Sequence, residues 1–313
     1  MIRVGLVGAR GYVGREMIAA LDSDLRFDLA FASSRAMAGR ELRTVPGLEH
    51  LSRFGSHRAG ELSADDVAGS DADVIVLGLP NGLAAPYVEA LDREGHPGVV
   101  IDLSADHRHQ PGWVYGSPEL RGEQMLGAKR IANPGCYATA ANLALAPLEG
   151  LVAGRVSVFG LSGFSGAGTT PGLRNDPERL ENNVQPYGFG GHGHEAEIAA
   201  TTGCAVTFAP HVAGFFRGLL VTLTVPLSDR LEVGAVAERF GAFYQPFPRV
   251  AVREAAPEIR DVAGRDGCVI GGFAVSGDVP VLTLSSALDN LRKGAATQAI
   301  ENMEKALGMA SWP

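Results

Sequence analysis

Residues 3–21, RVGLVGARGYVGREMIAAL, decide the fold of this chain. Arg3 to Val7 has the pattern of a short apolar strand, and Val13 to Leu21 has the pattern of a helix that opens directly after glycines. Between them, Gly8 to Gly14 has GxxGxxG spacing, a variant of the fingerprint in which helix-start N–H groups hold a pyrophosphate. Such a triplet is also typical of a tight turn, but its place in a β-α-β unit favours a bound dinucleotide.

The alternation of short apolar runs with helical stretches continues along the first part of the chain. Further strand-like runs lie at Phe27 to Ala32, Asp73 to Leu77 and Gly98 to Leu103, and Ala84 to Glu94 has a helical pattern. Strands that alternate with helices favour a parallel sheet covered on both faces. The sequence therefore predicts an α/β fold that begins with a Rossmann-type dinucleotide-binding domain, residues 1–140.

The character of the chain changes after about residue 140. Strand-like runs follow one another with few helical patterns between them, at Val156–Leu161, Ala205–Ala209, Leu219–Val225, Arg249–Val252 and Val281–Ser285. This pattern predicts a second domain, residues 141–287, of α+β type with a mixed or antiparallel sheet, for catalysis, substrate binding and oligomerisation. Residues 288–313 have a helical pattern, and we expect this helix to pack back on the first domain.

The composition agrees with two packed domains and excludes several classes of partner. The chain has 313 residues, of which 46% are hydrophobic and 20% charged, and its formal net charge is −8. This balance offers no basic surface to nucleic acid or to an anionic membrane. The start lacks the pattern of a signal peptide, and no run approaches the roughly 20 apolar residues of a membrane span. We expect a soluble cytoplasmic protein.

The three cysteines differ in their surroundings. Their spacing fits neither CxxC nor a Cys/His finger, so no disulfide framework or structural zinc site is indicated. Cys204 and Cys268 lie beside apolar residues and are expected to be small buried side chains. Cys136, within Asn133 to Tyr137 (NPGCY), precedes an alanine-rich helical run from Ala138 to Leu148. The helix dipole lowers the pKa of a thiol at this position and favours the thiolate, so Cys136 is the best nucleophile.

The end of the second predicted strand bears on the choice of dinucleotide. Where an NAD enzyme carries an acidic residue for the ribose hydroxyls, this chain has Ser33, Ser34 and Arg35. Two hydroxyl groups and a guanidinium suit a 2′-phosphate and favour NADP. The alternative is that Arg35 is a solvated loop residue.

Two imidazoles lie close together in the second domain. His192 and His194, followed by Glu195 and Glu197, stand near an expected helix start, where one of them can act as the acid/base that a thiolate and a tetrahedral oxyanion require. Paired histidines also suggest a metal. Because no third and fourth ligands are evident nearby, we rank a metal below the acid/base role.

Two further segments can hold an anionic substrate. Ser162 to Gly168 (SGFSGAG) is a turn at a strand end that can present backbone N–H groups to a phosphate or carboxylate, or serve as a flexible connector. His211 and Arg217 precede another strand, and the guanidinium can bind a carboxylate or phosphate in a forked geometry. A surface arginine is the ordinary alternative.

These motifs together resemble the N-acetyl-gamma-glutamyl-phosphate reductase family of arginine biosynthesis, over nearly the whole chain. The matching stretches are GARGYVGRE (8–16), DLSADHR (102–108), YGSPEL (115–120), NPGCYAT (133–139), SGFSGAG (162–168), HGHEAEI (192–198), PHVAGFFRG (210–218) and LDNLRKGAATQAIENM (288–303). Several motifs in the same order are far more specific than any one. Two positions depart from the family. Asn81 stands where a histidine is usual, which puts a role for that side chain in doubt, and Thr297 replaces a small residue.

The resemblance implies that NADPH reduces N-acetyl-L-glutamyl 5-phosphate to N-acetyl-L-glutamate 5-semialdehyde with release of phosphate, in a homodimer or homotetramer. Cys136 is the implied nucleophile, which forms a thioester, and His192 or His194 is the acid/base. Expected cofactor-binding residues are Gly8, Arg10, Gly11, Tyr12, Val13, Gly14, Ser33, Ser34, Arg35, Pro80, Ser165, Gly166 and Asn290. Expected substrate-binding residues are Arg108, Asn133, Ser162, Gly163, His211 and Arg217, with Arg217 on the carboxylate and the 162–168 loop on the phosphate. No metal is expected.

Other functions fit the same motifs. Reductases of aminoadipyl phosphate or aspartyl phosphate share this chemistry and differ in substrate length, for which one methylene changes binding by roughly 1–3 kcal/mol. The non-enzyme alternative is an NADP-binding sensor module that has lost catalysis. Cys136, both histidines and Arg217 argue against that alternative.

Overall fold

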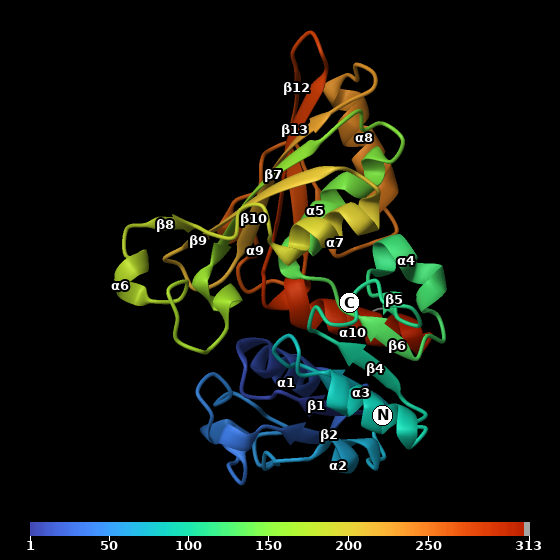
Figure 1. Ribbon diagram of the computed structural model, residues 1–313, viewed down its shortest axis with the longest axis vertical. Coiled ribbons are helices and arrows are strands. Elements are labelled where there is room, and N and C mark those ends of the chain that lie inside the picture. Colours follow the sequence, from blue (N-terminus) through green and yellow to red (C-terminus); the bar gives the residue numbers. More distant parts are fainter. Residues whose placement is uncertain (310–313) are drawn as a thin grey trace. The chain divides into compact units, whose positions relative to one another are not determined.

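The chain folds into two compact units (Figure 1). The structure is a computed structural model that describes residues 1–309. The first unit comprises residues 1–134 and the chain from Ala295 onward, and the second comprises Gly135–Gly294. The division at 134/135 precedes a helix that packs in the second unit, whereas the expected boundary at residue 140 lies inside that helix. Residues 310–313 of the predicted terminal helix lie outside the described residues.

The first unit is built on a six-stranded sheet in which every pair of neighbours is parallel. The strand order is β2 (Phe27–Ser33), β1 (Ile2–Val7), β3 (Val74–Leu77), β4 (Val99–Asp102), β6 (Arg130–Ala132) and β5 (Val114–Tyr115). The chain moves outward from β1 in both directions, so the order reverses between β1 and β3, and ligands of such sheets bind beyond the carboxyl ends of the strands at this point. The predicted parallel sheet is confirmed.

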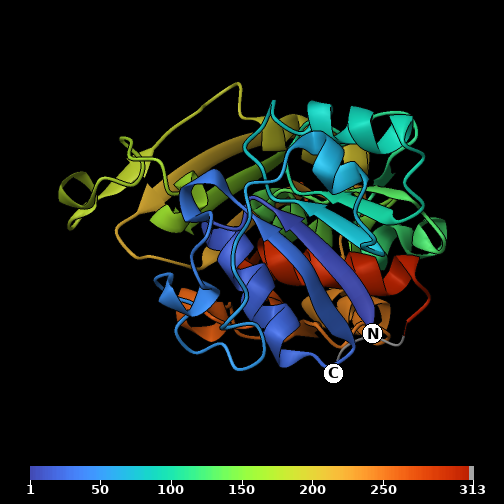
Figure 2. The same cartoon turned by 90° about the horizontal axis from the view of Figure 1, so that it is seen from below.

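Helices cover both faces of this sheet. They are α1 (Tyr12–Ser23), α2 (Ala64–Ala68), α3 (Ala85–Arg93), α4 (Pro118–Met125) and α10 (Thr297–Ala306). Strand side chains alternate between two cores, because successive residues of a strand point to opposite faces. Leu6 packs in one core with α1 and α10, whereas Val7 packs in the other with α2 and α3. Figure 2 shows α1 (blue) and α10 (red) on one side of the strands and α3 (cyan) on the other.

The second unit is built on a seven-stranded mixed sheet. The strand order is β11 (Val250–Val252), β12 (Cys268–Ser276), β13 (Val281–Leu288), β10 (Leu219–Pro226), β7 (Val156–Gly163), β9 (Val206–Ala213) and β8 (Val184–Pro186). The pairs β11–β12 and β7–β9 are parallel, and the other neighbours are antiparallel. This arrangement confirms the predicted mixed sheet.

One face of the mixed sheet is covered by α5 (Cys136–Leu145), α7 (Gly193–Thr202) and α8 (Val233–Tyr244). Helix α5 lies in the centre of the core and is buried nearly all round, so its seven alanine, leucine and tyrosine side chains all pack in the interior. A helix start near His192 was expected from the sequence and α7 begins there, whereas α8 was not predicted. The short helices α6 (Pro177–Leu180) and α9 (Ile259–Val262) complete the unit.

Within residues 1–309, no helix is long and apolar enough to cross a bilayer.

Candidate active site

Cys136 lines a cavity of about 190 Å³ in the second unit. The lining residues come from α5, from the end of β7 and the turn after it, from the segment that leads through α6 and β8, from the start of α7, and from β9. They are Cys136, Tyr137, Ser162, Gly163, Gly166, Ala167, Arg174, Tyr187, His192, His194 and Val212. The fold therefore brings together the predicted nucleophile, both predicted histidines and the predicted glycine loop.

The local structure places Cys136 at the first residue of α5. Gly135 is the extended N-cap residue and provides no side-chain cap, so the N-terminal turn of the helix lies beside the thiol. The N–H group of Gly135 donates to Oε1 of Glu197 at 2.9 Å, and Glu197 is only 5% exposed. Gly294 packs so closely that a Cβ atom there would lie 2.8 Å from Cβ of Cys136. Cys136 is therefore held from two sides by segments distant in sequence.

His192 caps the helix that carries His194. Its Nδ1 accepts a hydrogen bond from the backbone N–H of His194 at 3.2 Å. Burial, together with the positive charge of Arg174, lowers the pKa of His192 below its ordinary value. His192 is thus neutral near pH 7, with Nδ1 as acceptor and Nε2 carrying the proton.

His194 lies beside a carboxylate. Its Nε2 is 4.0 Å from Oε2 of Glu197, and its ring centroid is 4.7 Å from that of His192. The same carboxylate that accepts from the amide before Cys136 therefore faces the second imidazole. From the sequence, Glu197 was expected only as a neighbour of the histidines. Its contact with Gly135 joins residues 62 positions apart and has no local signal.

Two tyrosines complete the wall of the cavity. The hydroxyl of Tyr137 donates to the backbone oxygen of His211 at 2.7 Å, and the ring of Tyr187 lies 5.5 Å from that of His192. Burial raises the pKa of both tyrosines, so each remains a neutral hydroxyl. Tyr187 and Arg174 were not predicted, because each belongs to a segment without regular periodicity.

The glycine- and serine-rich loop after β7 forms a tight 3-10 turn, Phe164–Ala167. At Gly163, a Cβ atom would lie 2.6 Å from the backbone oxygen of Phe216, so only glycine allows the two segments to approach. Ser162, Gly163, Gly166 and Ala167 line the cavity, as the predicted role requires.

Four predicted residues of this unit do not line the cavity. Arg217 forms an ion pair with Asp289 (Nε to Oδ2, 2.7 Å), which is fully buried. The ring of His211 packs against the ring of Phe159, and their centroids are 4.5 Å apart. The amide of Asn290 donates to the Ser165 hydroxyl at 2.9 Å, and both side chains are buried. The binding roles of these residues stay predictions, and the structure gives each an internal partner.

The glycine loop of the first unit has the geometry of a phosphate-binding turn. Gly8 has a φ of 91°, and a Cβ atom there would lie 2.0 Å from the backbone oxygen of Gly78. At Gly14 a Cβ atom would lie 2.5 Å from the backbone oxygen of Gly8. Helix α1 follows Gly11, which provides no side-chain cap. These residues fit a dinucleotide, because glycines place no side chain between a pyrophosphate and the backbone N–H groups at the helix N-terminus. Arg10, Tyr12 and Val13 lie on the same turn.

The predicted 2′-phosphate residues have different environments. Ser33 is buried, and its hydroxyl accepts from the N–H of Leu62 at 3.0 Å, while Ser34 is half-buried. The side chain of Arg35 is 89% exposed and forms an ion pair with Glu61 at 2.8 Å. Arg35 is therefore accessible to a ligand, but a carboxylate that the sequence analysis did not consider already lies against it.

The remaining predicted residues belong to the first unit. Nε of Arg108 donates to the backbone oxygen of Asn133 at 2.9 Å, and Asn133 is itself buried against Asn302. Pro80 is exposed. The amide oxygen of Asn81, the position that departs from the family, accepts from the N–H of Ala105 at 3.0 Å. Arg108 and Asn133 thus hold the loop that follows β6.

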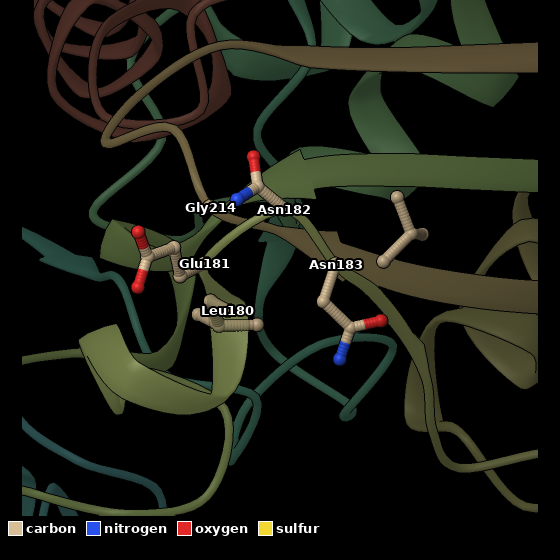
Figure 3. A pocket seen from close by; sticks show the side chains of 6 residues that line it. Leu180, Glu181, Asn182, Asn183 and Gly214 are labelled. Carbon is tan, nitrogen blue, oxygen red and sulfur yellow. The ribbon is translucent and has the colours of Figure 1, made fainter.

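A larger hollow of about 460 Å³ lies elsewhere in the second unit (Figure 3). It is lined by Leu180, Glu181, Asn182, Asn183, Val184 and Gly214, between α6 and β8. In Figure 3 the side chains of Glu181 and Asn183 point away from each other. The smaller cavity at Cys136 is the candidate active site because the reactive side chains meet there. No group of three or more His, Cys, Asp or Glu side chains in residues 1–309 is arranged to hold a metal ion.

Comparison with known proteins places both units in one group. Residues 3–128 match the model of the semialdehyde dehydrogenase NAD binding domain, and residues 136–290 match that of the semialdehyde dehydrogenase dimerisation domain. The first of these gives the chain a nicotinamide-dinucleotide-binding domain, and the second a domain of an oligomeric enzyme.

Several relatives match nearly all of the chain. It is 44% identical over 306 residues to N-acetyl-gamma-glutamyl-phosphate reductase of Xanthomonas axonopodis pv. citri, which covers 97% of this chain and 95% of the relative. It is 44% identical over 307 residues to the protein of that name from Stenotrophomonas maltophilia, with coverage of 98% and 95%. It is 41% identical over 319 residues to Protein arg-6, mitochondrial, of Neurospora crassa, with coverage of 99% of this chain and 36% of the relative.

Solved structures share the fold at lower identity. Aspartate semialdehyde dehydrogenase II of Vibrio cholerae, complexed with ASA, matches with a TM-score of 0.78 at 19% identity, covering 97% of this chain and 98% of that one. Aspartate semialdehyde dehydrogenase of Candida albicans, with NADP, matches with a TM-score of 0.74 at 16% identity, covering 97% and 98%. At these identities the likeness shows the fold alone.

Proposed function

The chain belongs to the N-acetyl-gamma-glutamyl-phosphate reductase family, and from that premise we propose that it carries out the family's reaction through a thioester on Cys136. It is an oxidoreductase that converts an acyl phosphate into an aldehyde, namely N-acetyl-L-glutamyl 5-phosphate into N-acetyl-L-glutamate 5-semialdehyde and phosphate, in arginine biosynthesis. The observation that supports the mechanism is the position of Cys136, at a helix N-terminus and in one cavity with two imidazoles.

The thiolate of Cys136 attacks the acyl carbon, and the C–O bond to phosphate breaks. A thiol suits this step because it is nucleophilic near neutral pH and its thioester accepts hydride more readily than an oxygen ester. When bound, the nicotinamide cofactor supplies the hydride. The resulting thiohemiacetal loses its C–S bond as the aldehyde forms, and the thiolate is regenerated.

His194 is the proposed acid/base for the thiohemiacetal oxygen. Nδ1 of His192 is engaged as the helix cap, and the lowered pKa of this residue keeps it neutral. Nε2 of His194 instead faces the Glu197 carboxylate at 4.0 Å, and this contact orients the ring within the cavity. His192 then serves as a hydrogen-bond donor through Nε2. The loop from Ser162 to Gly168 is the proposed site of the phosphate, because its turn brings backbone groups to the cavity wall.

NADP is the proposed dinucleotide, bound by the turn from Gly8 to Gly14. The support is that β2 ends without an acidic residue and is followed by Arg35, whose side chain is exposed. Because Glu61 pairs with Arg35, a 2′-phosphate would have to compete with that carboxylate. The preference for NADP over NAD is therefore open to direct measurement.

A homodimer or homotetramer is the proposed assembly. Side chains of α5, α7 and α8 pack in one core with the sheet of the second unit, whereas Phe159 on β7 is 43% exposed. An exposed aromatic side chain on a strand of this sheet suits a contact with a second copy of the chain. The cytoplasmic location stays a prediction.

The test follows NADP reduction in the reverse direction, with N-acetylglutamate semialdehyde, phosphate and NADP, for the wild type and Cys136→Ala. Phosphate-dependent turnover that disappears in the variant, while NADP binding persists, supports the reaction and the nucleophile. Aspartyl and aminoadipyl semialdehydes serve as competing substrates. A wild type that binds NADP but turns over none of the three aldehydes would be a binding module.

A further inference from the structure

The cavity around Cys136 contains one permanently charged cation. Arg174 is the only arginine or lysine in the lining for the part of the chain that the structure describes. It lies between the turn Phe164–Ala167 and the short helix α6, Pro177–Leu180. No carboxylate within residues 1–309 pairs with it, whereas other exposed arginines, such as Arg35 and Arg93, form ion pairs.

The guanidinium of Arg174 is held by an aromatic ring. Its central carbon lies 4.9 Å from the centroid of the Tyr187 ring, in a cation–π contact. A stacked guanidinium keeps the N–H groups of its edge available, so it can donate two parallel hydrogen bonds in its plane. Tyr187 and His192 both experience the charge of Arg174, which places that charge within the candidate active site.

The arginine that the sequence favoured for this role is engaged elsewhere. Arg217 donates to the buried carboxylate of Asp289 and does not line the cavity. Asp289 already neutralises the charge of Arg217. The cavity still needs a cation, since an anionic substrate that enters it loses water.

We propose that Arg174 determines substrate specificity by binding the carboxylate of the substrate, with its guanidinium edge, while Tyr187 holds the guanidinium plane. This proposal rests on the proposed function and assigns a site to one of the two anionic groups of that substrate. The planar fork of arginine matches a carboxylate. The backbone of the turn that carries Gly166 and Ala167 is left for the phosphate.

The reverse reaction separates the two anions, because the aldehyde carries the carboxylate and inorganic phosphate is a distinct substrate. Arg174→Gln should raise KM for N-acetylglutamate semialdehyde by about 10- to 100-fold, since charge-assisted hydrogen bonds are lost, and leave KM for phosphate within about twofold. Arg174→Lys should give an intermediate value because the charge remains and the fork is lost. The matched control is Arg179→Gln, which removes an exposed charge from α6 outside the cavity and should change neither constant.

A carboxylate-free substrate provides the second readout. The methyl ester of the semialdehyde should be used poorly and about equally by the wild type and Arg174→Gln. A rise in KM for phosphate in place of the aldehyde would overturn the proposal, and so would two unchanged constants in an active variant. A wild type without phosphate-dependent turnover of the semialdehyde would instead remove the proposed function itself, so the two failures are distinguishable.

Discussion

Replacing Gly294 with alanine is expected to slow the reaction about 100-fold without preventing folding. Gly294 lies in a π-helical turn, Arg292–Ala296, in which its N–H donates to the backbone oxygen of Asp289 at 2.9 Å. A Cβ atom at this position would lie 2.8 Å from Cβ of Cys136, 3.1 Å from Cδ1 of Leu288 and 3.2 Å from the oxygen of Asp289. The substitution therefore acts directly on Cys136, the proposed nucleophile.

The magnitude follows from these contacts. Carbon atoms in contact are normally about 3.5–4.0 Å apart, so Cys136 and Gly294 must separate by about 0.7 Å or more. Leu288 can rotate its side chain, but Cβ of Cys136 and the Asp289 oxygen are set by the backbone. Overpacking of this kind costs about 1–3 kcal/mol of stability. A displacement of about 1 Å at the reacting atom costs about 100-fold in rate.

The assay compares kcat, the melting temperature and the rate of thiol alkylation of Gly294→Ala with those of Gly241→Ala. Gly241 lies within α8, and a Cβ atom there meets nothing within 4 Å. Alanine in that helix should stabilise the protein by about 0.5–1 kcal/mol and leave kcat unchanged. A folded Gly294→Ala variant with the kcat of the wild type would refute the close approach to Cys136.

Two further predictions concern pH and cofactor choice. His192→Asn keeps an acceptor at the helix cap, but its side chain cannot titrate. Burial lowers the pKa of His192 from 6.5 in the folded state, so the unfolded state takes up the proton first and the wild type should lose stability as pH falls below about 6.5. In urea unfolding at about pH 5, the free energy of unfolding of the variant should therefore fall less than that of the wild type. Glu61→Gln removes the carboxylate that pairs with Arg35 and should lower KM for NADPH by about two- to fivefold, as expected for an exposed ion pair. KM for NADH should not change, and an equal change for both cofactors would contradict a contact between Arg35 and the 2′-phosphate.

Much of the fold and some of the site could be predicted from local patterns. The β1-α1-β2 start was evident because apolar periodicity and glycine spacing act within about 30 residues. The same holds for Cys136 at the start of α5 and for the histidines at the start of α7, where a change from turn residues to a helical run marks the position. The pattern did not reveal α8, whose alanines and glycines blur its apolar face.

The tertiary structure decided which charged residues reach the cavity. Arg217 and Arg174 have the same chemistry, yet the fold pairs Arg217 with buried Asp289 and sets Arg174 over Tyr187 beside the cavity. Residue types alone cannot distinguish these outcomes, because an ion pair depends on which distant segments meet.

The sequence by itself thus determined the class of fold and predicted the nucleophile and the chemistry, since each is expressed in residues that are neighbours along the chain. Only the tertiary structure placed Glu197 against Gly135, Gly294 against Cys136 and Glu61 against Arg35. Those contacts join segments separated by loops and strands. Their geometry arises when strands pair and helices pack, and no local preference of the backbone encodes it.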